Sequence, residues 1–220
     1  MERNQPTRSR VLRGSVRAID AVLRRKFGII EFERGPDALI RVGVGRAEHR
    51  RLLCDGTELK PDDLVLELHF WNEHLLTVPP GGATLAWAVL IRRQVTRSLR
   101  HLAGYLRTAP DLAHVRALRI RPAFAGRNVL RNLGWIVAKH GFESVDHRPS
   151  GSAPGAYVWL DSLWLWLLTW TFNPQSLRGR RFRRKRQEFW ISRDRFMTLY
   201  GEDRDAASDR LAARRSIRAR

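Results

Sequence analysis

The chain has 220 residues, a length that fits one domain with at most a short appendage. Hydrophobic residues make up 43% of it, which excludes wholesale disorder, and the single cysteine, Cys54, excludes an internal disulfide framework. The net charge of +19 at pH 7 is far from ordinary and indicates an anionic partner.

The excess positive charge is concentrated in the middle of the chain. Residues 1–73 hold 14 Lys and Arg against 12 Asp and Glu, residues 74–187 hold 19 against 4, and residues 188–220 hold 8 against 6. Such an asymmetric field attracts polyanions: anionic lipid, nucleic acid or an acidic envelope polymer.

The first third of the chain predicts a basic amphipathic helix and a compact β unit. The helix covers residues 9–27, and the Asp55-Gly56 pair predicts a tight turn between extended segments. In the clearest strand, Leu66 and Leu68 point one way while Glu67 and His69 point the other. We expect strands at residues 39–44, 50–54 and 64–71.

The rest of the chain predicts a long helix and several shorter elements. Thr84 caps a helix through about residue 107, whose buried stripe faces away from a stripe of arginines at 93, 97, 100 and 107. Gly141 closes a second helix, and Ser192 caps a third that ends at Tyr200-Gly201. The second helix covers residues 127–140. Further predicted elements are a strand at 115–120, a strand at 142–145, an apolar segment at 156–172 and an edge strand at 189–191.

Together these elements predict an α+β fold in a single domain. We expect a small, mostly antiparallel sheet covered by three or four helices, including those at 84–107, 127–140 and 156–172. The expected organisation is a flexible N-terminus at 1–8, an α+β domain at 9–201 with an exposed basic loop at 175–187, and a charged, disordered tail at 202–220. No apolar segment suited to secretion follows Met1, so we expect a cytoplasmic protein, peripheral at the inner membrane face if an anionic surface holds it.

Three stretches of the chain occur in a characteristic order. Residues 55–63 (DGTELKPDD) lead into residues 68–72 (LHFWN), a helix ends in GFE at 141–143, and residues 189–193 (FWISR) precede residues 199–201 (LYG). In this order they resemble the YkoP-like domain, a bacterial module found alone or C-terminal to polysaccharide deacetylase domains.

The resemblance implies a bacterial accessory role linked to envelope polysaccharides. It does not imply deacetylation, because that activity needs an Asp-Asp pair and a His-x-x-x-His pair to hold a catalytic metal. Asp62-Asp63 lies in a predicted turn, and no His-x-x-x-His occurs in the chain. We therefore expect a non-catalytic protein without a metal or another cofactor.

The apolar segment at 156–172 is rich in tryptophan and is followed by a cluster of arginines. A transmembrane helix needs about 20 apolar residues, and this segment is shorter and contains Asp161. Three interpretations stay open: a core helix, a helix lying in the plane of a membrane surface, and a contact with a protein partner. The tryptophans are Trp159, Trp164, Trp166 and Trp170.

The arginine cluster is the predicted anionic-surface site. It would dock the domain on an anionic membrane surface, or on an envelope-polysaccharide enzyme. Nonspecific nucleic-acid binding is an alternative, since phosphate contacts need only positive charge, and a solvated loop is the other. The cluster comprises Arg178, Arg180, Arg181, Arg183, Arg184, Lys185 and Arg186.

A weaker candidate site lies at the end of the strand at 64–71. His69 and Asn72 could serve an enzyme of unknown substrate there, because loops at strand ends project side chains from a rigid base. The alternative is structural, with both side chains hydrogen-bonded to backbone near the loop that contains Pro79-Pro80. A metal site would need a third ligand, which neither Cys54 nor another histidine supplies.

Overall fold

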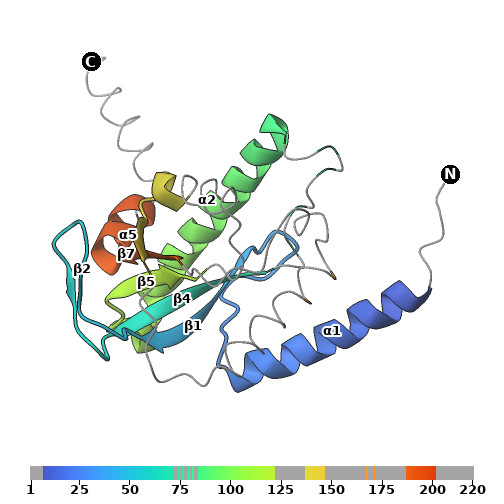
Figure 1. The fold of residues 1–220 in the computed structure, drawn as a ribbon, viewed down its shortest axis with the longest axis horizontal. Coiled ribbons are helices and arrows are strands. Elements are labelled where there is room, and N and C mark those ends of the chain that lie inside the picture. The colour runs from blue at the N-terminus through green and yellow to red at the C-terminus, as the bar shows by residue number, and fades with distance from the viewer. Residues whose placement is uncertain are drawn as a thin grey trace, which may run out of the picture.

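The computed structural model describes residues 7–71, 74, 76, 79, 81, 84–121, 137–146, 167, 171 and 187–201. These residues form an α+β fold with one five-stranded sheet and one two-stranded sheet (Figure 1). The elements are α1 (Thr7–Lys26), β1 (Ile40–Arg46), β2 (Arg51–Leu52), β3 (Glu58–Leu59), β4 (Leu64–Phe70), α2 (Leu85–Thr108), the 3₁₀ turn η1 (Pro110–Leu112), β5 (Ala117–Ile120), β6 (Glu143–Asp146), β7 (Gln187–Ser192) and α5 (Arg193–Tyr200).

The five-stranded sheet is mixed, with the strand order β1-β4-β5-β7-β6. β4 and β5 are parallel, and the other three pairings are antiparallel. A parallel pair needs a long crossover, which α2 provides. The prediction that residues 189–191 form an edge strand is wrong, because β7 lies between β5 and β6. Three consecutive buried side chains, Phe189, Trp190 and Ile191, fit a strand that is covered on both faces.

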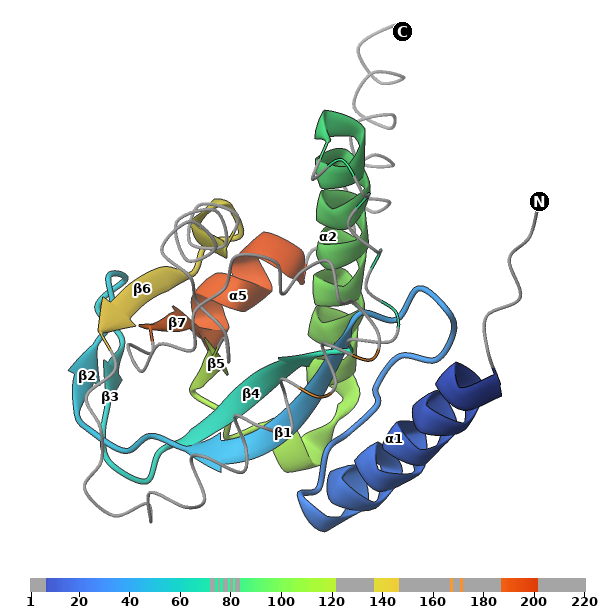
Figure 2. The same cartoon turned by 45° about the vertical axis from the view of Figure 1, so that its right-hand side comes forward.

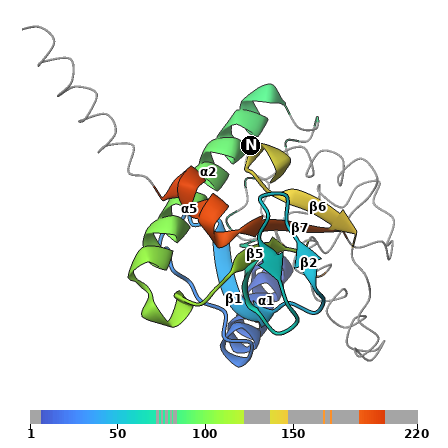
Figure 3. The same ribbon diagram turned by 90° about the vertical axis from the view of Figure 1, so that its left-hand side faces the viewer.

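One face of the sheet carries the main core. Leu66 of β4 and Leu118 of β5 pack there with Leu102 and Leu106 of α2 and with Phe196 of α5. Figure 3 shows α2 and α5 on the same side of the sheet. The predicted limits of the long helix are confirmed, and the side chain of Thr84 accepts a hydrogen bond from the backbone N–H of Trp87 at 3.2 Å.

The opposite face is covered at one end by the β2–β3 hairpin. Leu53 and Leu59 of this hairpin pack with Val65 of β4 and Trp190 of β7 in a smaller apolar cluster. The predicted turn at Asp55-Gly56 is confirmed: Gly56 has a φ of 86°, in the left-handed region that favours glycine. The rest of this face carries charged side chains.

The α1 helix lies beside β1, the edge strand of the sheet (Figure 2). Val16 of α1 is buried, and the carboxylate of Asp20 accepts a hydrogen bond from Arg41 of β1 at 2.9 Å. Arg24 of α1 pairs with Glu31 in the segment between the helix and the sheet. The predicted amphipathic helix is therefore confirmed and is held to the sheet by ion pairs.

The predicted helices at 127–140 and 156–172 lie largely outside the described residues. Only the C-terminal end of the first is described, at residues 137–139. There Gly141 has a φ of 85°, and the N–H of Phe142 donates to the carbonyl of Val137, so the predicted glycine cap is confirmed. No helix in the described part of the chain is long and apolar enough to cross a membrane.

Candidate functional site

The structure describes only part of the residues that the sequence singled out. Asn72 and the arginine cluster at 178–186 lie outside the described residues. His69 is described: it lies near the end of β4 opposite Arg41 of β1, and its side chain is 45% exposed. His74 has a structural role, because its Nδ1 lies 2.7 Å from the carbonyl oxygen of Ala38 and its ring stacks on Trp71.

Six charged side chains form an ionic network beside His69, on the same face of the sheet. Arg119 and Glu188 are its buried members, with 2% and 3% of their side chains exposed. Glu188 accepts hydrogen bonds from Arg121 at 2.9 Å and from Arg51 at 3.3 Å, while Arg119 pairs with Glu67 of β4. The members of the network are Glu48, Arg51, Glu67, Arg119, Arg121 and Glu188.

The ionic network balances three arginines against three glutamates. Burial alone would raise the pKa of Glu67, but Arg119 and Arg121 hold it below its ordinary value of 4.5. Burial opposes the charge of Arg121, yet its carboxylate neighbours raise the pKa of that guanidinium. Within the network, the positive charges of the arginines are therefore compensated by carboxylates that lie beside them.

Glu67 is also the acidic neighbour of His69. Its Oε2 lies 4.0 Å from Nε2 of His69, which is beyond hydrogen-bond distance. Because Glu67 is paired with Arg119 and its pKa is lowered, it is a poor general base. Within the described residues no group of His, Cys, Asp or Glu could hold a metal ion.

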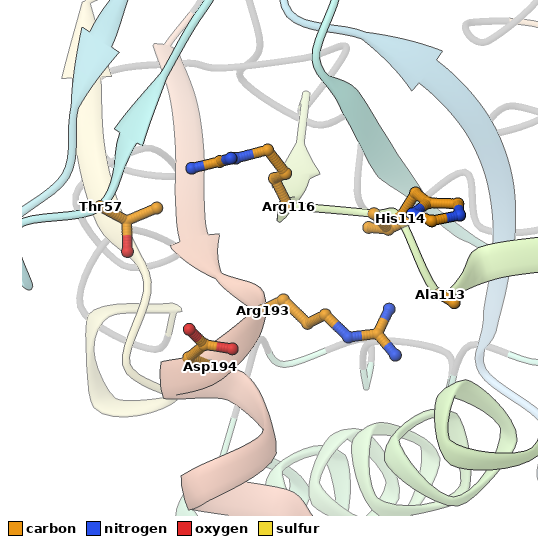
Figure 4. Close-up of a pocket in the computed structure, with 7 residues that line it drawn as sticks. Thr57, Ala113, His114, Arg116, Arg193 and Asp194 are labelled. Atoms are coloured by element: carbon orange, nitrogen blue, oxygen red, sulfur yellow. The ribbon is translucent and has the colours of Figure 1, made fainter.

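A pocket of about 490 Å³ lies between the β2–β3 turn and the start of α5 (Figure 4). Both of its arginines donate to backbone carbonyls: Arg193 to Leu106 at 3.0 Å, and Arg116 to Glu58 at 3.1 Å. Arg193 thereby satisfies a carbonyl near the C-terminal end of α2. The lining is Thr57, Ala113, His114, Val115, Arg116, Arg193 and Asp194, so this pocket does not include His69.

The outward face of α2 carries an arginine stripe. Arg93, Arg100 and Arg107 are exposed, and α2 contains no Asp or Glu in its 24 residues. Arg97 is exposed as well and pairs with Asp37 at 2.9 Å, and the hydrogen bond from its guanidinium to that carboxylate raises its pKa. The predicted arginine stripe opposite the buried stripe is thus confirmed.

The N-terminal end of α2 exposes apolar side chains, and we call this group the α2 tip. Figures 1 and 2 show this end of the helix extending beyond the sheet. The indole N–H of Trp87 donates to the carbonyl of Leu76 at 3.4 Å, which joins the preceding loop to the helix. The tip comprises Leu76 (38% exposed), Leu85 (83%), Val89 (42%) and Leu90 (51%).

The sequence contains a signal for the α2 tip that the predicted buried stripe does not cover. Residues 85–90 read LAWAVL, which is apolar on every side of a helix. A helix of that kind is either surrounded by protein or placed in a nonpolar environment. The juxtaposition of apolar and basic residues expected at 156–186 therefore also occurs in α2.

These features define a small α+β domain with a basic, apolar-tipped helix and a charged sheet face. A family model for the YkoP domain matches residues 10–200, and the chain belongs to this family. No curated protein and no solved structure matches the chain.

Proposed function

We propose that this domain is a non-catalytic accessory module that docks on an anionic membrane surface through the arginine stripe of α2. The observation that carries the proposal is the outward face of α2, where Arg93, Arg100 and Arg107 are exposed on an acid-free helix that ends in the apolar α2 tip. A surface of this composition complements a layer of anionic headgroups above acyl chains.

The expected strength of docking follows from the number of exposed arginines. Each Lys or Arg near an anionic membrane surface contributes about 1 kcal/mol, so Arg93 and Arg100 together supply about 2 kcal/mol. The cluster at 178–186 would add to this contribution if it faces the same surface. Attraction of this kind is screened by salt over a Debye length of about 10 Å at 0.1 M.

Anionic lipid fits the surface of α2 better than nucleic acid does. A phosphate backbone requires positive charge, which α2 has, but exposed aliphatic side chains such as Leu85 and Leu90 add nothing to contacts with phosphates. A membrane interface uses both features. Docking at the membrane also suits the accessory role, linked to envelope-polysaccharide enzymes, that the resemblance implies.

Co-sedimentation with vesicles tests this proposal. We expect the full chain to bind vesicles made of equal parts phosphatidylglycerol and phosphatidylcholine, and not vesicles of phosphatidylcholine alone. Arg93→Glu with Arg100→Glu should weaken binding at least about tenfold, because each reversal replaces an attraction of about 1 kcal/mol by a repulsion.

A matched control distinguishes an effect of the α2 surface on binding from an effect of the net charge of the chain. Arg25→Glu with Lys26→Glu makes the same change in net charge at exposed positions of α1. We expect this pair to bind nearly as well as the original chain. Equal losses in the two pairs, or tighter binding to single-stranded DNA than to vesicles, would overturn the proposed docking face.

A further inference from the structure

We infer that the α2 tip penetrates the lipid interface, so that the domain is anchored by insertion and not by charge alone. This inference rests on the proposed docking of α2 on an anionic membrane. Electrostatic docking gives no reason for apolar side chains to be exposed at the tip. Leu85, Val89 and Leu90 nevertheless expose 83%, 42% and 51% of their surface. Clustered exposed apolar residues mark interaction sites more often than scattered ones do.

The order of residues along α2 matches the layers of a membrane interface. Leu85, Val89 and Arg93 are spaced four residues apart and therefore follow one side of the helix. With a rise of about 1.5 Å per residue, the arginine lies about 12 Å from Leu85 along the axis. Interfacial segments lie close to the membrane plane and bury their apolar side chains about 5–10 Å deep. With α2 inclined so that its tip is the deepest part, Arg93 and then Arg100 would lie at the level of the headgroups.

The backbone at the start of α2 also suits this depth. The first N–H groups of a helix have no partner within it, and the side chain of Thr84 accepts only the one from Trp87. At the boundary between headgroups and acyl chains, lipid phosphates accept hydrogen bonds from such groups and lie at the positive end of the helix dipole. Deeper insertion would leave these groups without acceptors.

The α2 tip is held to the body of the domain and need not unfold to insert. Four residues after Leu90, the side-chain amide of Gln94 donates to the carbonyl of His74 at 3.1 Å. One turn further along, the side chain of Ser98 accepts from the N–H of Leu39 and donates to the buried carboxylate of Glu33. The helix that carries the tip is therefore fixed to the folded domain within two turns of Leu90.

An environment-sensitive fluorophore tests insertion directly. In a Cys54→Ser background, a nitrobenzoxadiazole label attached after Ala86→Cys should shift to shorter wavelength and brighten when the chain binds vesicles of equal parts phosphatidylglycerol and phosphatidylcholine. The control carries the same label after Leu52→Cys, at a position 72% exposed in the β2–β3 hairpin. We expect no shift there.

Binding measurements with the same vesicles supply the second arm. Leu85→Ser and Leu90→Ser should each weaken binding about tenfold, because each removes an aliphatic side chain from a nonpolar environment. Leu52→Ser, an equal loss of apolar surface elsewhere, should leave binding unchanged.

The possible results separate insertion from docking. Arginine-dependent binding with an unshifted label at residue 86 would overturn insertion and leave docking intact. Absence of vesicle binding would overturn both. A label shift that occurs without vesicles and grows with protein concentration would instead assign the tip to contact with a second copy, and would also overturn insertion.

Discussion

Glu188 is the centre of the ionic network on the sheet. Its carboxylate accepts from Arg51, from Arg121 and from the indole N–H of Trp190 at 3.0 Å, and it is almost fully buried. The guanidinium of Arg119 lies over the ring of Trp190, 5.0 Å from its centroid. The side chain of Glu188 therefore neutralises buried positive charge and also orients the indole of Trp190.

Removal of the Glu188 carboxylate should destabilise the fold strongly. Glu188→Ala leaves buried guanidinium groups without their counter-charge, and breaking a buried ion pair in this way costs about 3–5 kcal/mol in the free energy of unfolding. Urea denaturation measures this loss. Glu58→Ala is the control, since its exposed pair with Arg50 contributes at most about 1 kcal/mol. A similar, small loss in both variants would contradict the central role of Glu188.

His140 makes the stability of the domain depend on pH. Burial, with a smaller effect of Arg92, lowers its pKa below the ordinary 6.5. Its Nδ1 lies 2.8 Å from the hydroxyl of Tyr200, and its buried Nε2 has no hydrogen-bond partner among the described residues. Protonation would place a charged N–H in that position, so the folded state favours the neutral ring.

The direction of the pH effect follows from this lowered pKa. As the pH falls through 6.5, the unfolded chain takes up a proton at His140 before the folded chain does, so the free energy of unfolding decreases. We expect His140→Gln to reduce the slope of stability against pH just below 6.5 in urea denaturation series. Tyr200→Phe should keep the slope, because it retains the burial. An unchanged slope in His140→Gln would assign the effect to other groups.

At the scale of elements, β7 and α2 have the largest influence on the architecture. β7 pairs with strands on both sides, and its residues enter both apolar clusters. α2 crosses from β4 to β5 and supplies much of the main core. The β2–β3 hairpin, by contrast, has two residues per strand and pairs with no other strand among the described residues.

This difference should be visible in hydrogen exchange. Amides in a central strand exchange only when a large part of the structure opens, whereas a short hairpin opens locally. We expect a peptide covering residues 187–192 to exchange at least about a hundredfold more slowly than one covering residues 51–59. Exchange measured by mass spectrometry checks this, and equal rates would place β7 at an exposed edge after all.

At the scale of the whole molecule, the sequence predicts local elements better than their arrangement. Period-two alternation identified β4, and helical spacing identified α2, because burial imposes those periods directly. The position of β7 could not be predicted, because strand order depends on contacts between residues far apart in the chain. Phe189, Trp190 and Ile191 do read as a strand buried on both faces, which was the available signal.

Less of the candidate site than of the fold could be predicted from the sequence. The arginine stripe of α2 followed from helical geometry, since residues opposite a buried stripe face solvent. The ionic network was not predictable, because Glu67, Arg119 and Glu188 come from three strands that only the folded sheet brings together. His69 was correctly placed on the face of β4 that it shares with Glu67, but its charged neighbours on β5 were not foreseen.

The place of β7 in the sheet also affects the order of events during synthesis. On one side β5 pairs with β7, and 66 residues lie between Ile120, the last residue of β5, and Gln187, the first residue of β7. At ribosomal rates of about 5–20 residues per second, the edge of β5 waits several seconds for that strand. Until then the nascent chain presents an unpaired strand edge together with an incomplete core, a combination that chaperones recognise. The sheet is therefore completed only after translation has passed Ser192.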